Sequence, residues 1–224
     1  MKNVNNKNKP KVKKEKTVLI LKSVAANMTS YNGFKWPRHG HVSAPDWKPT
    51  KECGNGLHGF LRGEGNGALA NWDSDANWLV VKVPEKTFID LVGKVKFPVG
   101  NVVYCGDRQS ATNYLIKHGC NGAIIGGTAT AGDSGTATAG YRGTATAGDR
   151  GTATAGYRGT ATAGDRGTAT AGDRGILNIR WWDGSRYRLG VFYVGENGVE
   201  ANTKYRCDNG KLVKANQEGG HVNG

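Results

Sequence analysis

The sequence predicts a mainly β protein of the α+β class, in which a short β-solenoid lies between a small α+β body and a C-terminal antiparallel meander. Three observations predict this class. Glycine accounts for 35 of 224 residues, about twice its usual frequency. Short runs rich in β-branched residues alternate with turn residues along most of the chain. An eight-residue unit beginning GTATAG occurs six times in succession.

A basic segment precedes the first predicted strand. Residues 1–16 contain seven Lys, one Glu and no aromatic residue, so we expect a disordered tail. This tail carries +6 of the formal net charge of +13. A polycation of this kind attracts nucleic acid or an acidic partner without sequence specificity, or it serves only solubility. The sequence leaves both roles open.

The predicted α+β body spans 17–126. Its strand candidates are 17–24, 78–83, 93–97, 101–105 and 121–126. One helix is predicted after Asp107, a favourable N-cap, because the apolar residues that follow have helical spacing and Gly119 is a typical terminator. The segment 101–125 therefore predicts a strand, helix and strand joined by a right-handed crossover.

The repeats occupy 127–174 and predict a β-solenoid of three sixteen-residue coils, each made of two units. Thr-Ala-Thr-Ala alternates with period two, so a strand places its threonines on one face and its alanines on the other. Gly-Asp-Arg-Gly and Gly-Tyr-Arg-Gly are typical of tight corners. We expect the arginines to interleave with the aspartates and reduce their repulsion. Equivalent corners should stack as Tyr141, Tyr157 and Asp173 on one side and Asp133, Asp149 and Asp165 on the other.

Bulky residues flank the repeats on both sides. Ile124 and Ile125 precede the first unit, and Ile176, Leu177 and Ile179 replace small residues after the last one. Burial of alanine alone contributes too little to offset the entropy lost in ordering the 48 repeat residues. We therefore expect these hydrophobic rungs to protect both ends of the solenoid from fraying.

After the repeats, 175–215 predicts the antiparallel meander, because strand-like runs are separated by Asp-Gly and Asn-Gly turns, and 216–224 predicts a flexible tail. The aromatic residues of this region have two interpretations. They form a platform on which bases stack beside arginines, or they pack in the core and across strands. These residues are Trp181, Trp182, Tyr187, Phe192 and Tyr193, with Arg180, Arg186 and Arg188 beside them.

The repeat GTATAGYRGTATAGDR resembles the sixteen-residue repeats of bacterial ice-nucleation proteins, and its Thr-x-Thr element resembles the ice-binding face of β-solenoid antifreeze proteins. The resemblance implies that rows of outward threonines order water into an ice-like lattice, and that stacked tyrosines, here Tyr141 and Tyr157, support lateral pairing. The implied rows are Thr128, Thr130, Thr144, Thr146, Thr160 and Thr162 on one side, or Thr136, Thr138, Thr152, Thr154, Thr168 and Thr170 on the other.

The body carries two further resemblances. Its CGNGLHG, GKVKFP and GDR segments resemble uncharacterised phage-borne and bacterial proteins, which implies a phage or mobile-element context but no activity. Small proteins in that context often inhibit a host factor. The stretch 54–60 also resembles the glycine-flanked strand of ADP-ribosyltransferases. That second resemblance implies an NAD-using enzyme in which His58 contacts a ribose and Glu64 supplies the carboxylate.

Several classes of protein find no support in the sequence. No apolar run is long enough for a membrane span and no export signal is present, so we expect a cytoplasmic protein. The four Cys form no CxxC pair and the histidines include only one close pair, His39 and His41, so we expect buried thiols, no metal site and no cofactor. The leading hypothesis is a non-enzymatic binding protein whose solenoid contacts another protein or a second copy of itself. Ice binding and an NAD-using enzyme are the alternatives.

Overall fold

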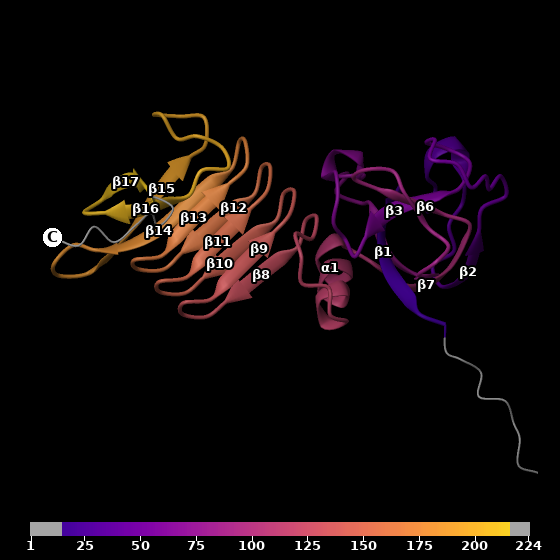
Figure 1. The fold of residues 1–224 in the computed structure, drawn as a ribbon, viewed down its shortest axis with the longest axis horizontal. Helices are drawn as coiled ribbons and strands as arrows, with labels where there is room; N and C mark the ends of the chain where they lie inside the picture. Colours follow the sequence, from indigo (N-terminus) through magenta and orange to yellow (C-terminus); the bar gives the residue numbers. More distant parts are fainter. Residues whose placement is uncertain (1–14, 216–224) are drawn as a thin grey trace, which may run out of the picture.

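The computed structural model describes residues 15–215, so the predicted tails at 1–16 and 216–224 lie outside it apart from Glu15 and Lys16. The described residues form a seven-stranded sheet with one α-helix, followed by two five-stranded sheets. In Figure 1 these parts follow one another along the long axis, with α1 between the N-terminal sheet and the solenoid.

The N-terminal sheet has the strand order β2-β7-β4-β1-β3-β6-β5, and all of its pairings are antiparallel. The strands predicted at 17–24, 78–83, 93–97 and 101–105 are confirmed. Two short 3-10 helices, η1 (Tyr31–Gly33) and η2 (Gly67–Leu69), lie in its loops. The strands are β1 (Thr17–Val24), β2 (Gly40–Ser43), β3 (Leu57–Leu61), β4 (Asn77–Pro84), β5 (Ile89–Asp90), β6 (Val95–Phe97) and β7 (Val99–Gly106).

Both faces of this sheet are buried. Successive side chains of β1 and β4 point to opposite sides of the sheet, and each side packs in its own hydrophobic cluster. Ile20 and Leu79 pack on one side in a cluster with Phe97. Leu21 packs on the other side in a cluster with Leu115 of α1. The central strands therefore read as nearly continuous apolar runs rather than as alternating ones.

The predicted helix is confirmed as α1 (Arg108–Lys117). Asp107 is its N-cap, with a carboxylate oxygen that accepts a hydrogen bond from the backbone N–H of Ser110 at 2.9 Å. Hydrogen bonds from the Ser110 hydroxyl and then from its backbone N–H hold the pKa of Asp107 below its usual value. The carboxylate is therefore committed to a structural role.

The strand predicted at 121–126 is wrong, and so is the strand, helix and strand crossover that it completed. This segment is irregular and ends in a turn at residues 125–126. The physical reason is that β7 already pairs with β2 and β4, so no edge beside it is left for another strand. Ile124 and Ile125 are nevertheless buried, and the Ile124 carbonyl accepts a hydrogen bond from the Gly140 N–H at 3.0 Å. The segment thus contacts the first coil at its N-terminal end without adding a strand to the solenoid.

The repeats form the predicted three-coil β-solenoid, with its strands in two parallel sheets. Thr144 pairs with Thr128 below it and with Thr160 above it, so equivalent residues are sixteen apart, as predicted. Ala145, Ala153 and Ala161 are fully buried. One sheet contains β8 (Thr128–Ala131), β10 (Thr144–Ala147) and β12 (Thr160–Ala163), and the other contains β9 (Thr136–Ala139), β11 (Thr152–Ala155) and β13 (Thr168–Ala171).

The corners explain the invariant punctuation of the repeat. The last residue of each repeat unit, from Ser134 to Arg174, adopts the left-handed backbone conformation, with φ between 52° and 58°. Glycine at position 148 is required by close approach, because a Cβ there would collide with the Asp133 carboxylate of the coil below. The corner sequence is therefore set by backbone conformation and by rung-to-rung distance.

The antiparallel C-terminal region is confirmed, and it forms two hairpins that each extend one solenoid sheet. β14 (Ile176–Trp182) pairs in parallel with β12 and antiparallel with β15 (Tyr187–Tyr193). β16 (Tyr205–Asp208) pairs with β13 and with β17 (Lys211–Lys214). Leu177 and Ile179 are fully buried against the alanines and close this end of the core. Figure 1 shows both hairpins at the end of the solenoid farthest from α1.

Candidate functional site

Outward threonines form two arrays on opposite sheets of the solenoid. The strand register places each threonine directly above its equivalent in the preceding coil. The first threonine face consists of Thr128, Thr130, Thr144, Thr146, Thr160 and Thr162 on β8, β10 and β12. The second threonine face consists of Thr136, Thr138, Thr152, Thr154, Thr168 and Thr170 on β9, β11 and β13.

The first threonine face is the more exposed of the two. Thr128, Thr130 and Thr144 are exposed, and the other three members are half-buried. Its hydroxyls meet other side chains only at its ends among the described residues: the Thr128 hydroxyl lies 3.4 Å from Gln109 Oε1, and Asn178 Nδ2 lies 3.3 Å from the Thr162 hydroxyl. The central hydroxyls of this face therefore have no side-chain hydrogen bond within the described residues.

The second threonine face is partly satisfied within itself. Thr136 is its one exposed member among the described residues. The hydroxyls of Thr152 and Thr168 form a hydrogen bond of 3.2 Å between neighbouring rungs. The sequence repeats alone could not distinguish the two faces, because both carry the same Thr-Ala-Thr-Ala strand.

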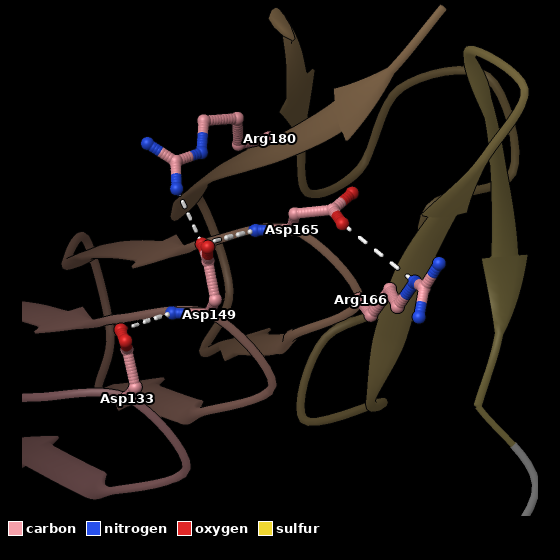
Figure 2. Close-up of polar contacts among 5 residues, drawn as sticks. All are labelled: Asp133, Asp149, Asp165, Arg166 and Arg180. Atoms are coloured by element: carbon pink, nitrogen blue, oxygen red, sulfur yellow. Dashed lines mark hydrogen bonds and ion pairs between the residues drawn. The ribbon is translucent and has the colours of Figure 1, made fainter. Parts of the chain in front are cut away.

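Aspartates form a ladder along one edge of the solenoid, as Figure 2 shows. The Asp133 carboxylate accepts a hydrogen bond of 2.9 Å from the Asp149 backbone N–H, and the Asp149 carboxylate accepts one of 2.9 Å from the Asp165 N–H. Arg180 also donates to Asp149, while Arg166 lies 3.7 Å from the Asp165 carboxylate. These hydrogen bonds, first that from Asp165 and then that from Arg180, lower the pKa of Asp149.

The ladder is therefore tolerated for a reason that differs from the expected one. Arginine interleaving is only partial in the described residues, since Asp133 has no arginine partner. The repulsion between the stacked carboxylates is compensated mainly by charge-assisted hydrogen bonds, which the carboxylates accept from backbone N–H groups of the next coil. The stacking order itself agrees with the prediction.

The tyrosines stack on the opposite edge, where the solenoid meets the body. The rings of Tyr141 and Tyr157 are 5.1 Å apart, and Tyr141 is 5.5 Å from the Trp72 ring. The Arg142 guanidinium lies 4.8 Å from the Trp72 ring centre. A Cβ at Gly67 would collide with the Tyr141 ring. Tyr141 is thus engaged with the body of its own chain.

The structure does not bring His58 and Glu64 together. His58 lies on β3 beside a cavity that Glu64 does not line. The Glu64 carboxylate packs instead against Gly122, in the segment that follows α1. Burial first, and then the ammonium groups of Lys94, Lys22 and Lys96, lower the pKa of His58 to about 4. The His58 imidazole is therefore neutral at neutral pH and has no acidic partner in Glu64.

Sequence reasoning missed a basic group around this same cavity. Lys22 and Lys94 line it together with Cys53, and Lys96 lies fully buried behind it. Cys53 is exposed and Cys105 is half-buried, which corrects the expectation that all four thiols are buried. The available signal was the position of Lys22 and Lys96 inside otherwise apolar strands.

Two features are absent from residues 15–215. No group of three or more His, Cys, Asp or Glu side chains is placed to hold a metal ion in that range. No helix there is long and apolar enough to cross a membrane.

The register, the corners and the outward threonines define a β-solenoid with a Thr-x-Thr repeat. Known proteins are similar to nearly half of this chain. Ice nucleation protein InaU of Pantoea ananas is 37% identical over 107 residues, which are 47% of this chain and 10% of that protein. An ice nucleation protein of Pseudomonas fluorescens is 39% identical over 104 residues, 46% of this chain and 9% of that protein. These relatives confirm the resemblance predicted from the repeat.

The chain spans about a tenth of the length of these curated relatives. A separate family, described as a domain of unknown function (DUF7666), matches residues 18–116. No solved structure matches the chain.

Proposed function

We propose that the solenoid binds ice, or water ordered as in ice, through the first threonine face. The observation that carries this proposal is the in-register array of two threonine columns over three coils. In such an array hydroxyls and methyl groups repeat at about 4.8 Å between rungs and about 6.7 Å along each strand. A repeating, rigid surface of this kind can anchor an ordered water layer.

The surroundings of the first threonine face support this choice over the second face. No charged residue lies between its threonines along β8, β10 and β12. β14 continues the same columns with Ile176 above Thr160 and Asn178 above Thr162. On the other sheet the next strand, β16, contributes exposed Arg206 and Asp208 instead. The uncharged surface is therefore longer on the first face.

The size of the face sets the expected activity. Three rungs extend for only about 14 Å, which is small for a template on which an ice nucleus forms. The relatives named as ice nucleation proteins are about ten times longer than the matched part of this chain. We therefore expect the protein to bind existing ice and slow its recrystallisation, rather than to nucleate ice just below the melting point.

Two matched substitutions test the proposal. Thr144→Tyr places a bulky ring in the middle of the first threonine face, and Thr152→Tyr makes the equivalent change on the second face. We expect Thr144→Tyr to abolish inhibition of ice recrystallisation and Thr152→Tyr to preserve most of it. Circular dichroism should show unchanged folding in both. An inactive parent protein, or equal loss in both variants, contradicts the assignment of the first face.

Self-association is a second candidate function, and a specific observation favours it. The edge hairpin of β14 and β15 exposes five large apolar side chains, with relative exposures from 46% to 59%. β15 is the outer strand of its sheet and so has a free backbone edge among the described residues. These residues are Trp182, Tyr187, Leu189, Val191 and Tyr193.

A charge on this edge tests self-association. Leu189→Lys with Val191→Lys should convert a dimer or larger species to monomer in sedimentation velocity, because two ammonium groups would face their equivalents across the contact. Thr154→Lys, on the second threonine face, is the matched control and should leave the assembly state unchanged. Weak self-association is detected at protein concentrations on the order of 100 micromolar. A parent protein that is still monomeric at that concentration would contradict this candidate.

A further inference from the structure

A cavity of about 660 Å³ opens in the N-terminal body, at a distance from both threonine faces. It lies beside β3, the end of β1 and the turn between β5 and β6. Its volume falls in the range of small-molecule sites. The proposed ice binding uses no residue of this cavity, so a ligand bound in the cavity is independent of ice binding.

The cavity carries more positive than negative charge. Neither Lys22 nor Lys94 forms an ion pair with a carboxylate among the described residues. Lys22 Nζ lies 5.8 Å from the centre of the Trp36 ring, and Lys94 Nζ lies 3.0 Å from Cys53 Sγ. The titratable and charged groups on or directly behind the cavity wall are Lys22, Tyr31, Asp46, Cys53, His58, Lys94 and Lys96.

The two ammonium groups repel one another in a partly desolvated space. Burial first, and then the charge of Lys94, lower the pKa of Lys22 to about 8. A hydrogen bond from Lys94 is the main cause that lowers the pKa of the Cys53 thiol. Both effects indicate a local excess of positive charge, which an anion would neutralise.

Lys96 holds the loop at the cavity mouth in place. Its side chain is fully buried, and Nζ donates to the Glu52 carbonyl at 2.8 Å and to the Gly54 carbonyl at 3.3 Å. The Gly54 backbone N–H in turn lies 3.4 Å from His58 Nε2. The loop that carries Cys53 is therefore positioned before any ligand arrives.

The rest of the wall suits the organic part of a ligand. Phe34 and Leu57 contribute apolar surface. Tyr31 and Leu69 also line the cavity yet are 88% and 53% exposed. An aromatic ring so exposed beside a basic cavity is well placed to stack on a planar group. A simple inorganic anion would leave most of this space unfilled.

We propose that this cavity binds a phosphate monoester that carries a planar ring. The phosphate lies between the ammonium groups of Lys22 and Lys94, and the ring lies against Tyr31 and Phe34. Neutral His58 adds a hydrogen-bonding group to the cavity wall and carries no charge of its own. Aryl phosphates and nucleoside monophosphates both have this chemistry.

Calorimetric titration with phenyl phosphate and with AMP tests the proposal, with phenol, adenosine and inorganic phosphate as controls. Each phosphate ester should bind at least about tenfold more tightly than its parent alcohol and than inorganic phosphate. Lys22→Met and Lys94→Met should each weaken binding by about tenfold or more, whereas Lys82→Met, an exposed lysine on β4, should not. Equal binding of ester and alcohol, or no binding of either ester, overturns the proposal.

The pH dependence provides a separate check on the unsubstituted protein. Since Lys22 must be protonated to bind a dianion, affinity should fall about tenfold between pH 7 and pH 9, as pH rises through a pKa of about 8. Binding near pH 8 should also take up protons, which titrations in buffers of different ionisation enthalpy measure. Affinity that stays constant to pH 9 contradicts a role for Lys22.

Cys53 gives a readout that does not depend on any variant being folded. A phosphate that engages Lys94 should raise the pKa of the Cys53 thiol and slow its alkylation by iodoacetamide. Half-buried Cys105 serves as the internal reference in the same mass spectrum. If phenyl phosphate and AMP slow both thiols equally, or neither, the phosphate does not lie at Lys94.

Discussion

Ala145→Asp will abolish cooperative folding of the solenoid. Ala145 is fully buried at the centre of the alanine core, where its neighbours are other alanines and no cation. An ionised carboxylate there has no partner, and a protonated one still lacks hydrogen bonds and adds volume. We expect a loss above about 4 kcal/mol, which is comparable with the whole stability of many domains.

Thr144→Asp is the matched control, because it adds the same group one residue earlier and on the outward side of β10. Thermal melts followed by circular dichroism should show a normal transition for this variant. Hydrogen exchange should show loss of protection in 127–174 for Ala145→Asp, with protection retained in β1 to β4. If the two variants melt at the same temperature, the inward and outward sides of the coil have been assigned wrongly.

Leu177→Ala will have the second largest effect on stability. Leu177 is fully buried where β14 closes the alanine core, and small repeat side chains beneath it cannot move to fill a cavity. Leucine-to-alanine changes at such sites cost about 3 kcal/mol. For a protein of this size that loss lowers Tm by roughly 6–12 °C in differential scanning calorimetry.

Leu189→Ala controls for the chemistry of that change without the burial. Leu189 is 59% exposed on neighbouring β15, so its truncation should shift Tm by less than about 2 °C. Equal shifts for both variants would mean that β14 does not cap the core. The comparison also separates a stability effect from the self-association test, in which Leu189 carries a charge instead.

The solenoid was predictable because its signal is repeated. Alternation of Thr and Ala fixes which side chains turn inward, and the sixteen-residue period fixes which corners stack. β1 was predictable at both ends, since a strand-like run of eight residues, apolar from Val18 to Leu21, lies between polar segments. The strand at 121–126 was not, because its composition is that of a strand while β7, the strand it was expected to join, already has a partner on each side. Pairing partners are a property of topology that local composition does not contain.

The candidate sites were also predictable only in part, where a local sequence pattern determines them. The threonine rows follow from the repeat, but the contacts at the two ends of the first threonine face, with Gln109 of α1 and Asn178 of β14, do not. The basic cavity was missed because Lys22, His58 and Lys94 come from segments far apart in the chain. His58 was singled out from its glycine-rich surroundings, whereas its lysine neighbours looked like ordinary surface charges.

The Asp and Tyr corners make the two sides of each coil inequivalent, and this has an evolutionary consequence. Nearly identical repeats in a gene gain or lose copies when strands misalign during replication. Since one unit is half a coil, loss of a single unit would turn the C-terminal hairpins by half a rotation about the solenoid axis. The face that begins beside α1 would then end at β16 rather than at β14. Only changes of two units keep the uncharged surface continuous, so selection for that surface would act on whether the copy number is even or odd.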